Sequence, residues 1–235
     1  GFRETSPRRI EPSKHDFSHL GYLVESKWLE DNLIAKRYLP EYLDILERID
    51  KSPHAVTTIG AIRNKLNTGA NINREHYCDP SRGRPYILVN NITDEGINTS
   101  ELKYVEHGSY DSAKNAIVKE GDILINRCGN PGIAAVVPSD FSGAIACGFV
   151  FKLSLKKEYD PYYVVAFLNS ELGRKQMQRI SWGTLLEHIT KTDLQKVKLI
   201  VPNKPQLERV SELMREAVKK RVEARKAISD AQANF

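Results

Sequence analysis

The end of the chain carries the most regular pattern in the sequence, and this pattern constrains the fold more than any other feature. Residues recur in alternating steps of three and four at Leu207, Val210, Met214, Ala217, Arg221, Ala224, Ile228 and Ala231. All of these positions, which we call the predicted seam, are apolar or small except for one arginine. Such alternation marks the a and d positions of a heptad repeat. We therefore predict one helix over 205–233, about 43 Å long at a rise of ~1.5 Å per residue.

This predicted helix has two interpretations. It packs along its own domain, or it forms a coiled coil with another chain or with another part of a longer chain. A solitary domain does not need an arm of this length, and the small alanines favour the close approach of another helix. Arg221 would weaken a fully buried seam, or it would set the register of the pairing.

Length and composition limit the class of protein. A chain of 235 residues allows one or two domains with a real core. The contents of 40% hydrophobic and 28% charged residues are ordinary for a soluble globular protein. No apolar run approaches the ~20 residues that span a bilayer. The net charge of +5 permits a polyanionic partner such as nucleic acid without proving one.

The first residues and the cysteines give weaker information. The polar, charged start indicates no signal peptide. Because the first residue is glycine and not methionine, we expect a tag remnant or a fragment of a longer protein. Cys78, Cys128 and Cys147 are widely spaced and form no CxxC pair, so neither a zinc cluster nor a disulfide framework is predicted. Reduced thiols in the cytoplasm are the expectation.

The chain divides into three predicted regions. Residues 1–53 form a polar, extended lead-in and then helices that pack on the next region. Residues 26–52 have a helical pattern that Pro40 divides, and a second helix from about 40 to 49 has the apolar face Tyr42, Leu43, Leu46 and Ile49. Residues 54–203 form the main domain. Residues 204–235 form the long helix.

The main domain is predicted to be α/β, with strands first and helices later. Its β-rich part, 54–157, contains the short apolar runs "AVTTIGAI", "PYILVNNI", "ELKYVEH", "AIVKEGDILINR", "GIAAVVP" and "GAIACGFVFKLSL". Residues 160–180 are helical, with Asp160 as N-cap, Pro161 at the first position and a break at Gly173. The buried stripe of this segment is Tyr163, Val164, Phe167 and Leu168. A short helix begins near Thr192 and Asp193, and the strand "VKLIVP" follows it.

The stretch "GDILINRCGNPGIAAVV" (121–137) tests for nucleotide chemistry. Gly129 and Gly132 do not make a GxGxxG fingerprint, and the residues that follow are β-branched, not helical. No Lys-Ser/Thr pair indicates a P-loop. The "NPGI" at 130–133 lacks the second proline and the aromatic ring of an amino-methyltransferase motif, and the glycine-rich methyl-donor loop is absent too. We therefore reject both a nucleotide pocket and a methyltransferase site here.

Other catalytic and metal sites find equally little support. The nearest match to a restriction-type nuclease cluster is Glu101–Lys103 after Asp94, and no Pro-Asp precedes it. The histidines are scattered, and His15 with His19 in a polar lead-in does not make a metal site. Ser181 precedes Trp-Gly and is not a nucleophile elbow. The sequence therefore favours binding over catalysis, with no catalytic residue and no metal predicted.

Several pieces in order carry a family resemblance. They are "PYILVNNITDEGIN", "VKEGDILINRCGNPGIAAVVP", "GFVFKL", "DPYYVVAFLNSELGRKQMQRISWGTLLEHITKTDLQKVKLIVPNKPQLERV" and the terminal heptad helix. Together they resemble the target recognition domain of type I restriction-modification specificity subunits, over about 55–233. The family commonly has Pro-Pro-(Leu)-x-x-Gln at the start of the long helix, where this chain has "VPNKPQLERV". A full specificity subunit carries two such domains, and this chain has one.

The resemblance implies a fold and a role. It implies a β-rich α/β recognition domain with flanking helices and a long C-terminal coiled-coil helix. Such domains read a half-site in the DNA major groove through loops and have no catalysis of their own. The long helix acts as a spacer and docks methyltransferase subunits.

Loop positions supply the candidate DNA-binding residues. Arginine pairs with guanine and asparagine with adenine by bidentate geometry, while lysine and threonine suit phosphates. The candidates are Arg74, Arg82, Arg84, Asn90, Asn91, Arg127, Asn130, Thr184, His188 and Lys191. Each has a plainer interpretation: a charged soluble loop for the first three arginines, a strand-closing turn for Asn90, and a surface ion pair for Arg127. Trp182 is more typical of a core anchor than of a base-stacking residue.

Three hypotheses remain open from the sequence. The first is a DNA specificity module for host defence, reading double-stranded DNA with methyltransferase subunits and a restriction or translocase subunit. The chain itself would bind no cofactor, while its partners would use S-adenosylmethionine, Mg²⁺ and ATP. It would form a homodimer, or pair with a second recognition domain, through the long helix. The second is the recognition part of a fused methyltransferase or restriction enzyme, and the third is a coiled-coil assembly protein with no DNA role.

Overall fold

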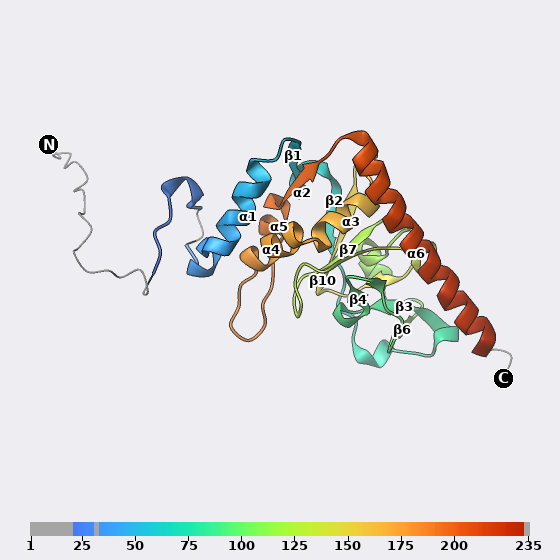
Figure 1. Ribbon diagram of the computed structural model, residues 1–235. Coiled ribbons are helices and arrows are strands. Elements are labelled where there is room, and N and C mark those ends of the chain that lie inside the picture. The colour runs from blue at the N-terminus through green and yellow to red at the C-terminus, as the bar shows by residue number, and fades with distance from the viewer. Residues whose placement is uncertain (1–20, 31–32, 233–235) are drawn as a thin grey trace.

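The computed structural model describes residues 21–30 and 33–232 and is a mixed α/β fold, as predicted. The predicted lead-in up to residue 20, with its two histidines, lies outside the described residues. An N-terminal segment and helix α1 lie on one side of the molecule, the sheets lie in the middle, and the long helix α6 lies along the other side (Figure 1). The α-helices are α1 (Pro40–Asp50), α2 (Ile59–Ile62), α3 (Pro161–Asn169), α4 (Glu171–Ile180), α5 (Lys191–Lys196) and α6 (Lys204–Gln232).

Strands and 3-10 turns fill the middle of the chain, as the short apolar runs predicted. The strands are β1 (Ala55–Thr58), β2 (Arg63–Thr68), β3 (Gly83–Ile87), β4 (Ile92–Thr93), β5 (Gly96–Ile97), β6 (Lys103–Glu106), β7 (Ile123–Asn126), β8 (Ala134–Val136), β9 (Ile145–Ala146), β10 (Val150–Leu155) and β11 (Lys198–Val201). The 3-10 helices are η1 (Ser26–Trp28), η2 (Ala35–Tyr38), η3 (Arg74–His76), η4 (Pro80–Arg82), η5 (Val89–Asn91), η6 (Asp111–Ala116) and η7 (Ser139–Phe141).

The strands form small sheets around one central four-stranded sheet. Its order is β2-β10-β7-β8, and all of its pairings are antiparallel. A second sheet has the order β6-β3-β9, in which β3 and β9 are parallel. Strands β4 and β5 form a hairpin, and β1 pairs with β11, so the two ends of the main domain meet.

The central sheet separates two hydrophobic cores. All four residues of β7 are buried, and alternate side chains point to opposite faces of a strand. Ile123 and Ile125 belong to a core shared with α3, α4 and α5, whereas Leu124 belongs to a core shared with β3 and β9. Burial on both faces explains why the "ILI" at 123–125 is continuously apolar and does not alternate with polar residues.

The helical region after β10 confirms the predicted start and corrects the predicted break. Asp160 caps α3 by accepting a hydrogen bond from the Tyr162 amide, and Pro161 is the first residue of the helix. The break comes at Ser170, whose side chain accepts from the Gly173 amide and caps α4. Gly173 lies inside α4. A Cβ at this position would come 2.3 Å from the carbonyl oxygen of Phe167 on α3, so the position requires glycine. Glycine thus serves a close approach of two helices.

The region before residue 54 contains less helix than predicted. Regular helix begins at Pro40, and only the 3-10 turns η1 and η2 are found earlier among the described residues. On α1, Ile45 is buried with Tyr42, Leu46 and Ile49, while Leu43 is half-buried. The "IGAI" part of the first apolar run is the short helix α2, not strand.

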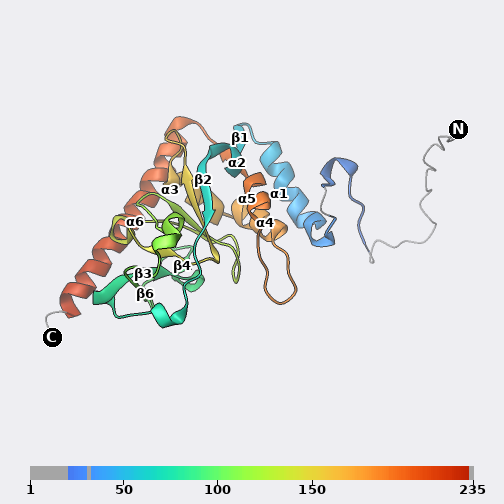
Figure 2. The ribbon, with the colours of Figure 1, turned by 180° about the vertical axis from the view of Figure 1, so that it is seen from behind.

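Helix α6 matches the predicted bounds within one residue and packs along its own domain. It lies against α3 and continues toward the end of the molecule that holds β3 and β6 (Figures 1 and 2). Ser211 and Val218 are buried, and Met214 packs on the core beneath α3. The predicted seam coincides only in part with the face that the domain covers: Leu207, Met214, Ala217 and Arg221 are half-buried, whereas Val210, Ala224 and Ile228 are exposed. The described helices include none with the length and apolarity needed to cross a membrane.

Candidate nucleic-acid interface

A loop between α4 and α5 projects from the domain (orange in Figure 1). We call residues 182–188 the projecting loop. Its ends pair through two backbone hydrogen bonds, Trp182 N to His188 O at 3.0 Å and His188 N to Trp182 O at 2.8 Å. The Trp182 and His188 rings lie against each other, with centroids 3.9 Å apart. Thr184 is exposed in this loop, and Lys191 is exposed at the start of α5.

The turn between β7 and β8 lies beside the base of this loop. The Ile189 amide donates to the Arg127 carbonyl at 2.9 Å, and the Arg127 amide donates to Phe149 O at 3.0 Å. The Arg127 guanidinium lies over the Phe151 ring, 6.0 Å from its centroid. Arg127 therefore lies between the projecting loop and the segment before β10. Its side chain is half-buried and carries a positively charged guanidinium.

The two glycines of this turn are required by its backbone conformation, and one of them also by close packing. Gly129 and Gly132 both have positive φ, 76° and 88°, a conformation that favours glycine. A Cβ on Gly132 would also come 2.3 Å from the Met177 side chain on α4. Between them, Asn130 is exposed and accepts a hydrogen bond from Arg174 at 3.1 Å. The turn thus presents one amide side chain to solvent, held by an arginine of α4.

A neighbouring asparagine was missed by the sequence analysis. Asn126 at the end of β7 is buried, and its amide donates to Val89 O at 3.1 Å and Ile92 O at 3.3 Å. These bonds fix the 89–92 segment beside the turn. A buried asparagine at the end of an apolar strand was the available signal, since such a group needs hydrogen-bond partners.

The adjacent Asn90 and Asn91 have opposite surroundings. Asn90 is exposed on η5. Asn91 is completely buried; it accepts from the Leu88 amide at 3.0 Å and donates to Asn98 O and Ser100 O at 3.1 and 3.2 Å. Because its amide is used inside the protein, Asn91 is withdrawn from the predicted DNA-binding residues.

The three arginines of 73–86 lie around the sheet of β3 and β6. Arg74 is exposed on η3. Arg82 pairs with Glu106 at 2.8 Å but keeps most of its side chain in solvent. Arg84 donates to Gly143 O at 3.2 Å and lies over the Tyr110 ring at 5.6 Å. Internal contacts therefore occupy Arg84, whereas Arg74 and Arg82 remain accessible.

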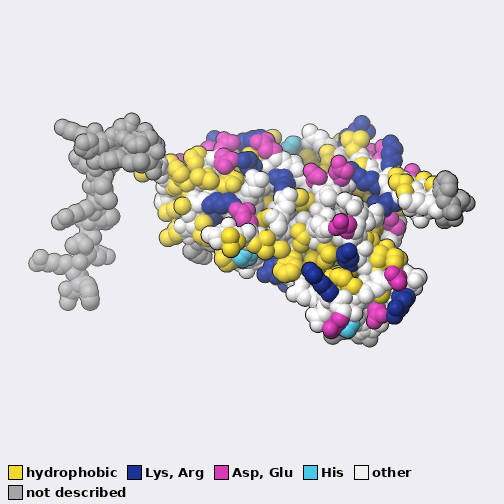
Figure 3. All heavy atoms as spheres, turned by 90° about the horizontal axis from the view of Figure 1, so that it is seen from below, with side chains coloured by type: hydrophobic (Ala, Val, Ile, Leu, Met, Phe, Trp, Pro, Cys, Tyr) yellow, Lys and Arg dark blue, Asp and Glu magenta, His cyan; other side chains and the backbone are white. Residues whose placement is uncertain are grey.

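A hollow of about 700 Å³ lies between the 88–94 segment and the β7–β8 turn. It is lined by Leu88, Val89, Asn90, Ile92, Thr93, Asp94, Asn126, Asn130, Ile133, Cys147 and Phe149. Asn90 and Asn130 thus border one hollow, and Phe149 connects it to Arg127 and the base of the projecting loop. Figure 3 views the molecule from the side to which the loop projects, where hydrophobic side chains are mixed with lysines and arginines and with scattered Asp and Glu.

Carboxylates near the base of the projecting loop are paired internally. Lys36 on η2 forms an ion pair with Glu187 and donates to Ser181 Oγ at 3.1 Å, and Ser181 in turn donates to Glu187 at 2.9 Å. The hydrogen bond from Lys36 lowers the pKa of Glu187 below its usual value. Burial raises the pKa of Asp193, but hydrogen bonds from Arg37 and Thr190 outweigh this effect and leave the pKa lowered.

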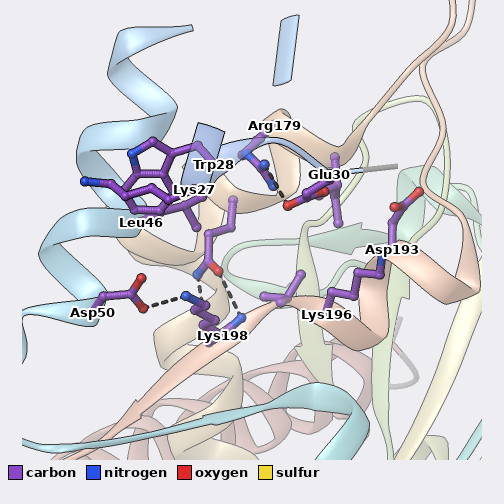
Figure 4. Close-up of a pocket in the computed structure, with 12 residues that line it drawn as sticks. Lys27, Trp28, Glu30, Leu46, Asp50, Arg179, Asp193, Lys196 and Lys198 are labelled. Atoms are coloured by element: carbon purple, nitrogen blue, oxygen red, sulfur yellow. Dashed lines mark hydrogen bonds and ion pairs between the residues drawn. The ribbon is translucent and has the colours of Figure 1, made fainter. Parts of the chain in front are cut away.

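A smaller hollow of about 230 Å³ lies behind this region, between the N-terminal segment, α1, α4 and α5 (Figure 4). Two ion pairs lie in its lining: Arg179 with Glu30 at 2.8 Å, and Lys198 with Asp50. These pairs join the N-terminal segment and α1 to the main domain, so the hollow is a packing boundary. Among the described residues, no cluster of three His, Cys, Asp or Glu could hold a metal.

Solved structures share this fold at low sequence identity. The S subunit of a type I restriction-modification system from M. genitalium matches with a TM-score of 0.50 and 15% identity, covering 70% of this chain and 38% of that one. The HsdS subunit from Thermoanaerobacter tengcongensis matches with a TM-score of 0.53 and 17% identity, covering 83% and 46%. The type IIG restriction endonuclease BpuSI matches with a TM-score of 0.57 and 10% identity, covering 77% and 28%.

This chain therefore spans less than half the length of each of these three proteins. No curated protein sequence matches it. A family model, the type I restriction modification DNA specificity domain, matches residues 56–224. That match runs from β1 through most of α6 and includes both the projecting loop and the β7–β8 turn. The chain belongs to the family of the type I restriction modification DNA specificity domain.

Proposed function

We propose that this chain is a sequence-specific DNA recognition module of a restriction-modification system, reading one half-site with its 54–203 region. The observation that carries the proposal is the family match over 56–224, which includes the surface formed by the projecting loop and the β7–β8 turn. We call this surface, with Asn90, Arg127, Asn130, Thr184, His188 and Lys191, the reading face. Its side chains suit both base edges and phosphates.

The chemistry of the reading face supports binding over catalysis. Arg127 offers a guanidinium for guanine, and Asn90 and Asn130 offer amides for adenine. Lys191 and Thr184 suit phosphates, which position a protein without reading sequence. Catalysis, with S-adenosylmethionine, Mg²⁺ and ATP, would belong to methyltransferase and restriction or translocase subunits, and no cofactor is assigned to this chain.

Helix α6 supports pairing with a second recognition domain. One face packs on α3, while Val210, Leu213 and Ile228 are exposed on α6. Burying such side chains against a partner helix would be favourable. The pairing partner is a second copy of this chain or a second recognition domain. If the chain is part of a fused enzyme, for which the fold shared with a type IIG endonuclease is the supporting observation, its recognition role is unchanged.

The direct test is selection from a randomised duplex library at about 150 mM salt, where non-specific phosphate binding is weakened. Enrichment of a short motif would support a half-site reader, and two copies at fixed spacing would support pairing through α6. The selection is repeated with a methyltransferase subunit present. A pool that stays random in both experiments would overturn the proposal and favour a coiled-coil assembly protein.

Variants then identify the reading residues. Arg127→Ala is expected to weaken binding by about 1–3 kcal/mol and to relax preference at one position of the motif. Arg48→Ala, an exposed arginine on α1, is the matched control and should change neither affinity nor preference. If both variants retain the full preference of the wild type, Arg127 does not read a base.

A further inference from the structure

The projecting loop exposes three large apolar side chains, which is unusual for a surface loop. Leu185 has an exposed fraction of 101%, Leu186 of 55% and Trp182 of 40%. Apolar side chains gathered on a surface mark interaction sites more often than scattered ones do. The loop lies on the reading face, beside Arg127, through the hydrogen bond between the Ile189 amide and the Arg127 carbonyl.

The loop is held in one shape by its own base. Trp182 and His188 are joined by two backbone hydrogen bonds and by contact of their rings. Gly183 has φ 128°, and a Cβ there would come 2.3 Å from the Leu186 carbonyl oxygen, so only glycine allows the turn to close this tightly. A preformed loop loses little conformational entropy when it binds.

Lys36, from a distant part of the chain, fixes both ends of the loop. It contacts Ser181 just before the loop and Glu187 near its end, and Ser181 and Glu187 are bonded to each other. Its neighbour Arg37 is buried, bonds Asp193 at 2.9 and 3.0 Å and donates to Ile180 O at 3.4 Å. Arg179 donates to the Arg37 carbonyl at 2.9 Å and pairs with Glu30 (Figure 4). The N-terminal segment therefore anchors Lys36 against the main domain.

The charges around the loop favour an anionic partner such as the phosphates of DNA. Glu187 is the one carboxylate within 182–188, and Lys36 neutralises it, so no free negative charge in the loop repels phosphates. Two cationic residues lie at the base of the loop: Arg127, whose carbonyl accepts from the Ile189 amide, and Lys191, the first residue of α5. An exposed leucine between cationic side chains matches the design of DNA-bending proteins, which insert an apolar side chain between base pairs while cations hold the backbone.

We propose that Leu185 inserts between two adjacent base pairs of DNA bound at the reading face, and that Lys36 and Glu187 hold the projecting loop in the inserting shape. This inference rests on the proposed DNA-recognition function. Insertion would unstack one base step and would add preference for steps that unstack easily, such as pyrimidine–purine steps, without a hydrogen bond to a base.

The test uses duplexes that contain the selected motif, with 2-aminopurine placed in turn at each adenine of the motif and its flanks. Unstacking raises 2-aminopurine fluorescence. The whole chain should raise the signal at one step, and Leu185→Ala should abolish this rise and weaken binding about tenfold. A mismatch at that step should tighten binding of the wild type more than that of Leu185→Ala, since the unstacking cost is already met. Leu23→Ala, which removes another fully exposed leucine, is the matched control and should behave as the wild type.

The positioning role of Lys36 is tested by charge reversal. Lys36→Glu should reduce the fluorescence rise at the inserted step while the thermal unfolding midpoint and the selected motif stay close to those of the wild type. Adding Glu187→Lys to the same chain restores the ion pair with exchanged charges and should restore the rise. A rise that is unaffected by Lys36→Glu would overturn this part of the proposal.

The outcomes separate this inference from the proposed function. If the wild type selects a motif but raises the fluorescence at no step, and Leu185→Ala binds as tightly, insertion is wrong and DNA recognition stands. If Leu185→Ala weakens binding of a methyltransferase subunit and leaves DNA binding unchanged, the loop is a protein contact and insertion is wrong. If no motif is selected with or without the partner, the proposed function fails and insertion fails with it.

Discussion

The two flanks of the molecule are attached to the main domain by the same kind of ion pair in different surroundings. On the N-terminal side, Arg37 pairs with Asp193, and the side chains are only 1% and 13% exposed. On the C-terminal side, Arg225 of α6 pairs with Asp140, and the side chains are 21% and 34% exposed. A buried pair is costly to break because one charge is left without a partner, whereas solvent screens an accessible pair.

This difference indicates different roles for the two flanks. The N-terminal segment is integral to the domain, since its Arg37 is buried against Asp193 of α5 and its Glu30 pairs with Arg179 of α4. Helix α6 is held chiefly by its contact with α3 and keeps Val210, Leu213 and Ile228 exposed. The first flank supports the projecting loop, and the second presents a surface for a partner helix. Four predictions test this comparison.

The largest effect is expected from Arg37→Ala. It leaves Asp193 buried without its cation and should lower the free energy of unfolding by about 3–5 kcal/mol. Urea denaturation followed by circular dichroism measures the change. The double variant Arg37→Met with Asp193→Leu removes both charges and should recover most of the loss. A loss below about 1 kcal/mol for the single variant would show that the pair behaves as a surface pair.

A smaller effect is expected from the apolar face of α6. Val218 is buried against the domain, and Val218→Ala removes two carbons, at ~0.8 kcal/mol each, for a loss of about 1.5–2 kcal/mol. Lys219→Ala, on an exposed position of the same helix, is the control and should stay within about 0.5 kcal/mol of the wild type. Equal stabilities of the two variants would mean that α6 does not pack on the domain in solution.

The accessible pair of α6 should contribute less still. Arg225→Ala removes the bonds to Asp140 at 3.0 and 3.1 Å and the contact with the Phe141 ring, yet we expect a loss of only about 0.5–1 kcal/mol. The loss should shrink at high salt, which screens exposed charges. A salt-independent loss as large as that of Arg37→Ala would remove the distinction between the flanks.

Acid should weaken the N-terminal attachment selectively, and this is the subtlest effect. The pKa of Asp193 is lowered in the folded chain, so its contribution to stability is present above the unfolded pKa and is lost as the pH falls through the folded pKa. The stability gap between wild type and Asp193→Asn should therefore narrow on acidification. The protection factors of residues 33–50 against hydrogen exchange, which correct for the intrinsic pH dependence of exchange, should fall over the same pH range. A gap that is constant with pH would contradict the ionised pair.

Local patterns in the sequence predicted the elements that local chemistry decides. Asp160 and Pro161 define the start of α3, and the heptad spacing gave the bounds of α6. Segments whose structure depends on distant partners were predicted less well. The "IGAI" run reads as a strand, but it forms α2 against α5. Gly173 reads as a helix breaker, yet the glycine is required by the close approach of α3.

The candidate site shows the same limit at the level of single residues. Asn90 and Asn91 are identical neighbours, and only the fold decides that one is exposed and the other is buried. The link between Lys36 and Glu187 joins residues far apart in the chain, so no local pattern could reveal it. The predicted seam likewise coincides only in part with the buried face of α6, because heptad spacing alone does not say which face a domain already covers.

The pairing of β1 with β11 has a consequence for how the chain folds. Strand β1 (residues 55–58) pairs with residues 198–201, and β2 pairs with β10, so both strands pair with segments far along the chain. Contacts between such distant segments slow folding because a long loop must close before they form. During synthesis, β1 and β2 therefore leave the ribosome long before their neighbours and present unpaired edges in the meantime, so production of this protein should depend on chaperones and on translation rate.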